Sequence, residues 1–278
     1  MQFGLTMFPA DFAIDVVELG RAAEDLGFES LFFPEHTHIP VGHDVRADGS
    51  RLPPEYAHAL DPFVALGAVA AATTRLKLGT GICLVIQRDP IVTAKAVASL
   101  DHLSRGRFLF GIGGGWNRQE IADHGTDPKT RWHLLRERLE AMERIWANDE
   151  AEYHGRFVDF GPLWSWPKPT QQPRPPILLG GDVPRARQRV VDYADGWIPH
   201  PFAQGEPAQH IADFHALCES AGRGRLPVTI YGGSAEPAEV ERYAAAGAAR
   251  WVFRVPAAAA DTVLPYLRRC ADVARSFN

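Results

Sequence analysis

The sequence predicts an α/β fold, a (β/α)8 TIM barrel that carries an insertion around residues 147–176. Two observations support this prediction. Strand-like apolar runs and helix-like segments alternate about eight times from one end of the chain to the other. The length of 278 residues suits one such barrel, which typically has ~250 residues. An open doubly wound sheet is the alternative, although it usually has fewer strands. We therefore expect a single domain over residues 1–278.

The N-terminal half contains four predicted strands, which are Phe3–Phe8, Ser30–Phe33, Leu76–Ile82 and Phe108–Ile112. Asp11 is the expected cap of the first helix, which ends at Gly27. Residues 37–60 form a long polar loop, and a loop of that length in a compact domain is usually functional or mobile. An acidic residue followed by proline predicts further helix starts. This pair occurs at Asp61-Pro62, Asp89-Pro90 and Asp127-Pro128, with weaker versions at Glu206-Pro207 and Glu236-Pro237.

The C-terminal half begins with an amphipathic helix over Arg131–Trp146. The insertion follows, and we expect a short hairpin around Tyr153–Phe160 in it. Four more strands complete the barrel, at Ile177–Leu179, Gly196–Ile198, Val228–Tyr231 and Trp251–Arg254. The helices between and after them are expected at Arg185–Tyr193, Gln209–Ala221 and Pro237–Ala246, with a last one from Asp261.

Composition excludes several classes of protein. The net charge of −5 and the lack of a basic run argue against a nucleic-acid partner. The three cysteines, Cys83, Cys218 and Cys270, are scattered singly, which is typical of a reducing cytosol. The N-terminus lacks the features of a signal peptide, and Ala68–Ala72, the most apolar helical stretch, is too short to span a bilayer. We expect a cytoplasmic protein with no membrane partner.

Glycines at the ends of strands indicate a large ligand. The run Phe108–Ile112 leads into a loop, and Gly111 and Gly113–Gly115 place four glycines within five residues. Gly180 and Gly181 follow another strand and precede a helix. Such turns allow close backbone approach and present N–H groups to an anion, so a flat ligand with a phosphate would use both. Tight turns without a ligand are the alternative. The pattern is not the dinucleotide fingerprint, because Trp116 stands where its third glycine belongs.

Glu35 and His36 directly follow the second strand, and in a barrel the site lies at the carboxyl ends of the strands. His36 suits a proton carrier, since histidine titrates near neutrality. A structural role is the alternative. We expect no metal site, because Glu35 and His36 would point to opposite sides of an extended chain and no further ligand stands at a recognisable spacing. His200, after the sixth strand, is a weaker candidate.

These residues and several neighbouring motifs resemble those of the luciferase-like monooxygenase superfamily, in particular of its coenzyme F420-dependent oxidoreductases. The resemblance covers nearly the whole chain, and its motifs are specific for the family when taken together. They are Phe3-Gly4-Leu5, Ala22-Ala23-Glu24-x-Leu26-Gly27-Phe28, Pro34-Glu35-His36, Leu78-Gly79-Thr80-Gly81-Ile82, Ser104-Arg105-Gly106-Arg107, Gly111-x-Gly113-x-Gly115-Trp116-Asn117-x-x-Glu120, Arg138-Leu139-Glu140, Pro175-Pro176-Ile177, Gly180-Gly181 and Ala194-Asp195-Gly196-Trp197.

The resemblance implies a role for each matching residue. Glu35 and His36 match the acidic–histidine pair at the reactive edge of the deazaflavin, and Gly81-Ile82 matches a bulge with a cis peptide bond beside the flavin. The other matches are to cofactor-binding loops: Gly113, Gly114 and Asn117 beside the ribityl chain, Gly180 and Gly181 at the phosphate, and Arg185 at the tail. Trp116 occupies a position where sugar-phosphate dehydrogenases of the family carry an acid, which argues against a phosphosugar substrate.

The resulting hypothesis is an enzyme that transfers a hydride between coenzyme F420 and a small organic substrate. The alternatives are an FMN-dependent monooxygenase supplied by a partner reductase, a non-catalytic F420-binding homologue, and an unrelated hydrolase using Glu35 and His36. Trp116, His200, Tyr56 and Trp164 are candidates to contact substrate, as are His43 and Trp166, with ordinary lid packing as the alternative for each. Family members are often dimers, so the resemblance also implies a homodimer.

Overall fold

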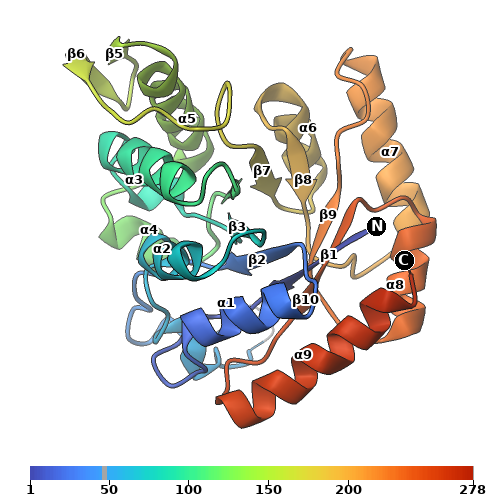
Figure 1. Ribbon diagram of the computed structural model, residues 1–278. Helices are drawn as coiled ribbons and strands as arrows, with labels where there is room; N and C mark the ends of the chain where they lie inside the picture. The colour runs from blue at the N-terminus through green and yellow to red at the C-terminus, as the bar shows by residue number, and fades with distance from the viewer. Residues whose placement is uncertain (46–48, 278) are drawn as a thin grey trace.

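The computed structural model describes residues 1–45 and 49–277. Eight parallel strands form one sheet in the order β8-β7-β4-β3-β2-β1-β10-β9 (Figure 1). A parallel bridge between Trp197 and Val228 brings β8 to β9 and nearly closes the sheet into a barrel. The strands are β1 (Gln2–Thr6), β2 (Ser30–Phe33), β3 (Lys77–Thr80), β4 (Phe108–Ile112), β7 (Ile177–Gly180), β8 (Gly196–Ile198), β9 (Thr229–Gly233) and β10 (Arg250–Arg254). The predicted TIM barrel is confirmed.

The α-helices surround the barrel (Figure 1). They are α1 (Val16–Asp25), α2 (Pro62–Ala72), α3 (Pro90–Leu103), α4 (Arg118–Asp123), α5 (Arg131–Ala147), α6 (Pro184–Tyr193), α7 (Pro207–Ser220), α8 (Pro237–Ala245) and α9 (Ala260–Arg275). Short 3₁₀ turns occur at Pro54–Tyr56 and Val85–Gln87. Within the described ranges, no helix is both long enough and apolar enough to cross a membrane.

The strands bury side chains on both faces, which explains their continuous apolar runs. In β2, Leu31 and Phe33 belong to the large core between the strands and the helices, whereas Phe32 belongs to a separate cluster. That second cluster consists of Phe32, Leu109, Leu178, Ile198, Tyr231 and Val252. Successive residues of a strand point to opposite faces, so one strand supplies both layers. The cluster that Phe32 joins draws on six of the eight strands, as packing inside a barrel requires.

Most expected helix starts are observed, with two corrections. Asp61 and Asp89 cap α2 and α3, with proline in the first turn of each helix. Asp11 is not the cap of α1. Its carboxylate pairs with His58, and Asp15 accepts the N–H groups of Val17 and Glu18 instead. The intervening turn is held by a bond from Ile14 N to Ala258 O, a tertiary contact that a local pattern does not reveal.

The second correction concerns Asp127-Pro128. This pair forms a turn in which Asp127 accepts from Lys129 N, and α5 begins later, after Thr130.

The insertion contains the expected hairpin, which is longer than predicted and consists of β5 (Glu150–His154) and β6 (Asp159–Trp164). It projects beyond the barrel beside α5 (Figure 1). Tyr153 OH donates to Glu140 of α5 at 2.8 Å, so the hairpin is an appendage of that helix.

Candidate functional site

A cavity of about 700 Å³ opens at the carboxyl ends of the strands. Such a volume is typical of sites for cofactors and small molecules. All eight barrel strands contribute to its wall. Seven do so through residues at the end of the strand or just beyond it, and β9 does so through Tyr231 within the strand. In chain order, these residues include Thr6, Phe8, Glu35, His36, Gly81, Ile82, Gly113, Gly114, Gly115, Trp116, Gly180, Gly181, Ile198, His200, Tyr231 and Arg254, with Glu55, Tyr56 and Trp132 from other segments.

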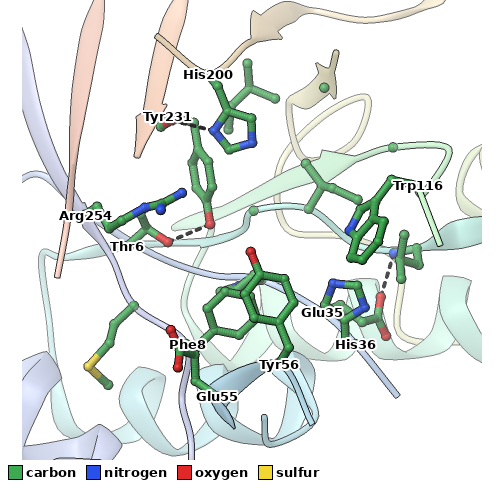
Figure 2. A pocket seen from close by; sticks show the side chains of 18 of the residues that line it. Thr6, Phe8, Glu35, His36, Glu55, Tyr56, Trp116, His200, Tyr231 and Arg254 are labelled. Atoms are coloured by element: carbon green, nitrogen blue, oxygen red, sulfur yellow. Dashed lines mark hydrogen bonds between the residues drawn. The ribbon is translucent and has the colours of Figure 1, made fainter. Parts of the chain in front are cut away.

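His36 lies in an aromatic corner of this cavity (Figure 2). Its ring stacks on Phe8 and lies 5.2 Å from the ring of Tyr56 and 5.8 Å from that of Trp116, between centroids. Its Nδ1 atom lies 2.8 Å from Oε2 of Glu120, a side chain that is 1% exposed. A carboxylate only accepts hydrogen bonds, so Nδ1 is the donor to Glu120 and Nε2 is left for other partners. Glu120 thus fixes the orientation of the His36 ring.

Glu35 is engaged elsewhere. Its carboxylate accepts from Leu84 N at 2.6 Å and from Arg88 Nε at 2.5 Å, and Arg88 also pairs with Asp61. Burial would lower the pKa of Arg88, but the charge of Glu35 raises it above its usual range. The predicted divergence of Glu35 and His36 is therefore observed, and the carboxylate beside His36 is that of Glu120. Glu35 anchors the end of β2 to the 3₁₀ turn at Val85–Gln87.

A second polar group lies across the cavity from His36 (Figure 2). The hydroxyls of Tyr231 and Thr6 are 2.5 Å apart, and burial raises the pKa of Tyr231 well above its usual range, so the phenol stays protonated. His200 Nδ1 donates to Tyr231 O at 3.0 Å. Burial lowers the pKa of His200, and the charge of Arg254 lowers it further, against the raising effect of that hydrogen bond. His200 is therefore a neutral imidazole at pH 7.

Gly81, Ile82, Gly113 and Gly180 also line the cavity, and we refer to these four residues as the apolar shelf. A Cβ atom on Gly113 would lie 2.9 Å from Cδ1 of Ile82, and one on Gly180 would lie 3.3 Å from its Cγ2. A Cβ on Gly81 would lie 2.4 Å from the ring of Tyr231. The glycines therefore make room for Ile82 and Tyr231, which in turn line the cavity. The Gly81-Ile82 peptide bond is cis, as predicted.

Five residues that the sequence predicted for the site do not line the cavity. Asn117 uses its side chain to cap α4 and to donate to His43 O at 3.3 Å. Arg185 is an exposed residue in the first turn of α6. Trp164 is 79% exposed on β6, and neither Trp166 nor His43 lines the cavity. The cavity does bring together Tyr56, Trp116 and His200.

Several residues of the site were missed by sequence reasoning. Tyr231 and Thr6 lie within strands, and inspecting the residues after each strand did not include them. Glu120 belongs to a glycine-loop motif, but its contact spans 84 positions. Trp132, at the start of α5, covers Gly114, where a Cβ atom would lie 2.8 Å from its ring. Including the last inward-facing residue of each strand would have identified Tyr231.

The chain is similar to known proteins along its whole length. An uncharacterised protein of Mycobacterium tuberculosis is 40% identical over 98% of both chains. The F420-dependent hydroxymycolic acid dehydrogenase of the same species is 26% identical over 97% of this chain and 71% of its own. The crystal structure of monooxygenase RslO1 from Streptomyces bottropensis superimposes with a TM-score of 0.79 at 20% identity, covering 100% of this chain and 99% of the other.

The family match agrees with this fold and site. The luciferase-like monooxygenase model matches residues 9–270, a range that includes all but one of the eight barrel strands and most of the cavity wall. This chain belongs to the luciferase-like monooxygenase family.

Proposed function

We propose that this chain is an F420-dependent oxidoreductase that transfers a hydride between the deazaflavin and a small organic substrate. The observation that carries the proposal is the arrangement of one cavity, whose wall contains both the apolar shelf and His36, which is held by Glu120. Similarity to an F420-dependent dehydrogenase over 97% of this chain supports it.

The shelf fits a planar ring system. Gly113 and Gly180 have no side chains, and the side chain of Ile82 packs directly against both of them. Tyr231 closes one side of the shelf, and Trp197 Nε1 donates to Gly181 O at 2.6 Å, which holds the glycine turn beyond it. When bound, the deazaflavin would supply the hydride chemistry, while the protein supplies orientation and proton management.

The protein's own part is the movement of one proton. Oxidising an alcohol removes a proton from its hydroxyl, and reducing a carbonyl adds one at the same oxygen. His36 Nε2 is the atom that we assign to this transfer, because Glu120 occupies Nδ1. The rings of Phe8, Tyr56 and Trp116 surround His36, whose side chain is 7% exposed. Tyr231 and Thr6 supply a neutral hydrogen-bond donor on the opposite wall.

The experiment compares cofactors directly. Protein prepared without cofactor is titrated with F420 and with FMN, and binding is followed by fluorescence. We expect F420 to bind at least about tenfold more tightly, a difference of about 1.4 kcal/mol. Reduced and oxidised F420 are then offered with panels of ketones and alcohols, and substrate-dependent change in the deazaflavin absorbance is recorded.

The other readings predict different results. Tighter binding of FMN, with oxygen consumption when a reductase supplies reduced flavin, would support the monooxygenase. Tight F420 binding without turnover of any compound would support a non-catalytic homologue.

A further inference from the structure

Two arginines lie on the same face of β10, at the two ends of the strand. Val252 belongs to the cluster inside the barrel, whereas Phe253 belongs to the core outside it. Because successive residues of a strand point to opposite faces, Arg250 and Arg254 face the barrel interior together with Val252. Arg250 is the first residue of the strand, and Arg254 is its last residue and lines the cavity.

The two arginines differ in their partners. Arg250 donates to both carboxylate oxygens of Glu29 and to the side chains of Thr229 and Gln2. Over the part of the chain that the structure describes, the guanidinium of Arg254 has no hydrogen-bond partner and no acidic oxygen within 4.0 Å. Arg254 is also the one Lys or Arg among the described residues of the cavity wall. The cavity therefore contains a single unpaired guanidinium, which suits an anionic group of a ligand.

The neighbours of Arg254 in the cavity are uncharged. A Cβ atom on Gly232 would lie 3.6 Å from Nε and Nη2 of Arg254 and 3.6 Å from Nδ1 of His200, so the two side chains lie close together. Figure 2 shows Arg254 next to Thr6 and Tyr231. Thr6 and Tyr231 are a pair of hydroxyls, and His200 is a neutral imidazole whose pKa is lowered by burial. None of these groups neutralises the guanidinium.

Arg254 and His36 lie on different sides of the cavity (Figure 2). In the sheet, β1 alone lies between β10 and β2. Neighbouring strands are about 4.8 Å apart, so the ends of β10 and β2 are separated by about 10 Å. The shelf residues come from β3, β4 and β7, which are farther from β10 than β2 is. A planar ligand on the shelf therefore leaves Arg254 to a second molecule in the same cavity.

A carboxylate of the protein lies in the same part of the cavity. Glu55, from the 3₁₀ turn Pro54–Tyr56, lines the cavity, and Figure 2 shows it on the same side as Arg254. No basic nitrogen lies within 4.0 Å of its carboxylate among the described residues. One guanidinium compensates one negative charge. A second charge, as on a phosphate monoester, would lie in the cavity with Glu55 and no further cation, and taking an unpaired charge out of water is unfavourable.

We propose that Arg254 binds a carboxylate of the substrate, which lies at the opposite end of the substrate from the reacting carbon. This inference rests on the proposed function, which places the reacting carbon beside the shelf and His36. Arg and a carboxylate form two parallel hydrogen bonds, which fixes the orientation of the acid. The separation of about 10 Å between the strand ends requires several carbon atoms between the two groups. The substrate class is therefore a medium-chain oxo or hydroxy acid, and neither a 2-oxo acid nor a phosphate ester.

The first test measures binding to the protein without cofactor. Octanoate, octanamide and octyl phosphate share one alkyl chain and differ in charge, and their binding is followed by tryptophan fluorescence because Trp116 lies in the cavity wall. We expect Arg254→Gln to bind octanoate about 10- to 100-fold more weakly than wild type, and octanamide within about twofold. Arg254→Lys keeps the charge but not the paired donors, so its affinity for octanoate should be intermediate. Octyl phosphate should bind wild type no more tightly than octanoate.

The second test measures turnover with reduced F420. The substrates are 7-oxooctanoate, its methyl ester and the isomer 2-oxooctanoate. Wild type should prefer 7-oxooctanoate to both. In Arg254→Gln, the KM for 7-oxooctanoate should rise by about 10- to 100-fold at nearly constant kcat, because binding is lost equally in the ground state and the transition state. The KM for the methyl ester should not change.

Arg268→Gln is the matched control. It removes the same charge from an exposed position on α9 that does not line the cavity, so binding and turnover should equal those of wild type. The inference is overturned if Arg254→Gln binds octanoate like wild type, if its affinities for octanoate and octanamide fall equally, or if octyl phosphate binds wild type more tightly than octanoate. Reduction of neutral ketones by F420 with no preference for acids also overturns it, while leaving the proposed function intact. A loss of octanoate binding in Arg254→Gln alone, in a protein that does not bind F420, would support the carboxylate site and reject the proposed function.

Discussion

Two adjacent side chains at the end of β2 serve different parts of the molecule. Glu35 is held by Arg88 and Leu84 N, so its carboxylate ties the strand to the neighbouring 3₁₀ turn. His36 faces the cavity and takes its carboxylate partner from α4. Successive side chains of an extended strand point to opposite faces, so the opposite directions of Glu35 and His36 were predictable from the sequence. The identity of the partner was not predictable, because Glu120 is brought to His36 only by the arrangement of β2, β4 and α4.

The first prediction at this scale concerns His36→Asn. Removing a general acid–base typically costs ~10²–10⁴-fold in rate, so single-turnover hydride transfer should slow by about that factor while F420 affinity is retained. His38→Asn is the matched control. His38 is two residues away and half-exposed, and it pairs with Asp123 at 3.1 Å outside the cavity. The control should transfer hydride like wild type. A His36 variant that does the same would remove this residue from the mechanism, and equal losses of melting temperature, binding and rate would assign it a structural role.

At the scale of elements, the amino ends of the strands are joined by ion pairs that stabilise the barrel. Arg250 of β10 donates to both oxygens of Glu29 at 2.8 Å and to Thr229 of β9 at 3.0 Å, and Lys77 of β3 pairs with Glu29 as well. These residues lie at the opposite end of the strands from the cavity, where a barrel keeps its structural residues. Burial would raise the pKa of Glu29, but the bonds from Arg250 and Lys77 lower it from 4.5 to about 2.

The pH prediction follows from that lowered pKa. Glu29 binds its proton more weakly in the folded than in the unfolded chain, so it stabilises the fold above about pH 4.5 and loses that effect as the pH falls toward 2. We expect Glu29→Gln to reduce the free energy of unfolding by about 2–3 kcal/mol at pH 7. The difference from wild type should shrink below pH 4.5 and vanish near pH 2. Glu24, whose pKa is also about 2, is present in both proteins, so its pH-dependent contribution cancels in the difference between them. Denaturant titrations at several pH values measure this difference in the free energy of unfolding. A difference that stays constant with pH would contradict the assignment to Glu29.

Helix starts were predictable where the residues that mark them are adjacent in the sequence. The Asp61-Pro62 and Asp89-Pro90 pairs open helices as expected, because cap and first turn are adjacent in sequence. Asp11 and Asp127 carry similar local signals, yet tertiary contacts of Ile14 and a turn before Thr130 move the helix starts. Position after a strand correctly indicated His36, Gly81 and Gly180 as cavity residues.

For the whole molecule, the junction between β8 and β9 is the place where the barrel does not close into a continuous ladder of strands. β8 has three residues. Besides the Trp197–Val228 bridge and the bond from His200 Nδ1 to Tyr231 O, the described hydrogen bonds that join the β8 side to the β9 side are two between backbone groups. These bonds run from Trp197 N to Pro227 O at 3.0 Å and from Tyr231 N to Pro199 O at 2.8 Å. Ile198 and His200 line the cavity on the β8 side, and Tyr231 does so on the β9 side. A ligand in the cavity therefore contacts both sides of the junction.

The last prediction is that cofactor binding stabilises this junction. Opening it would separate the two walls of the cavity, so the open form should not bind ligand. A ligand that binds only the closed form, at 100 times its Kd, stabilises that form by about 2.7 kcal/mol, which slows exchange through the open form about 100-fold. We expect that slowing at the amides of Trp197 and Tyr231 when F420 is added, measured by hydrogen exchange. The amide of Gly155, which donates to Val158 O at 2.8 Å in the β5–β6 hairpin, is the internal control. The hairpin can open without disturbing the cavity, so its exchange should not change. Equal exchange of Trp197 and Tyr231 with and without saturating F420 would show that the cavity is not coupled to closure of the barrel.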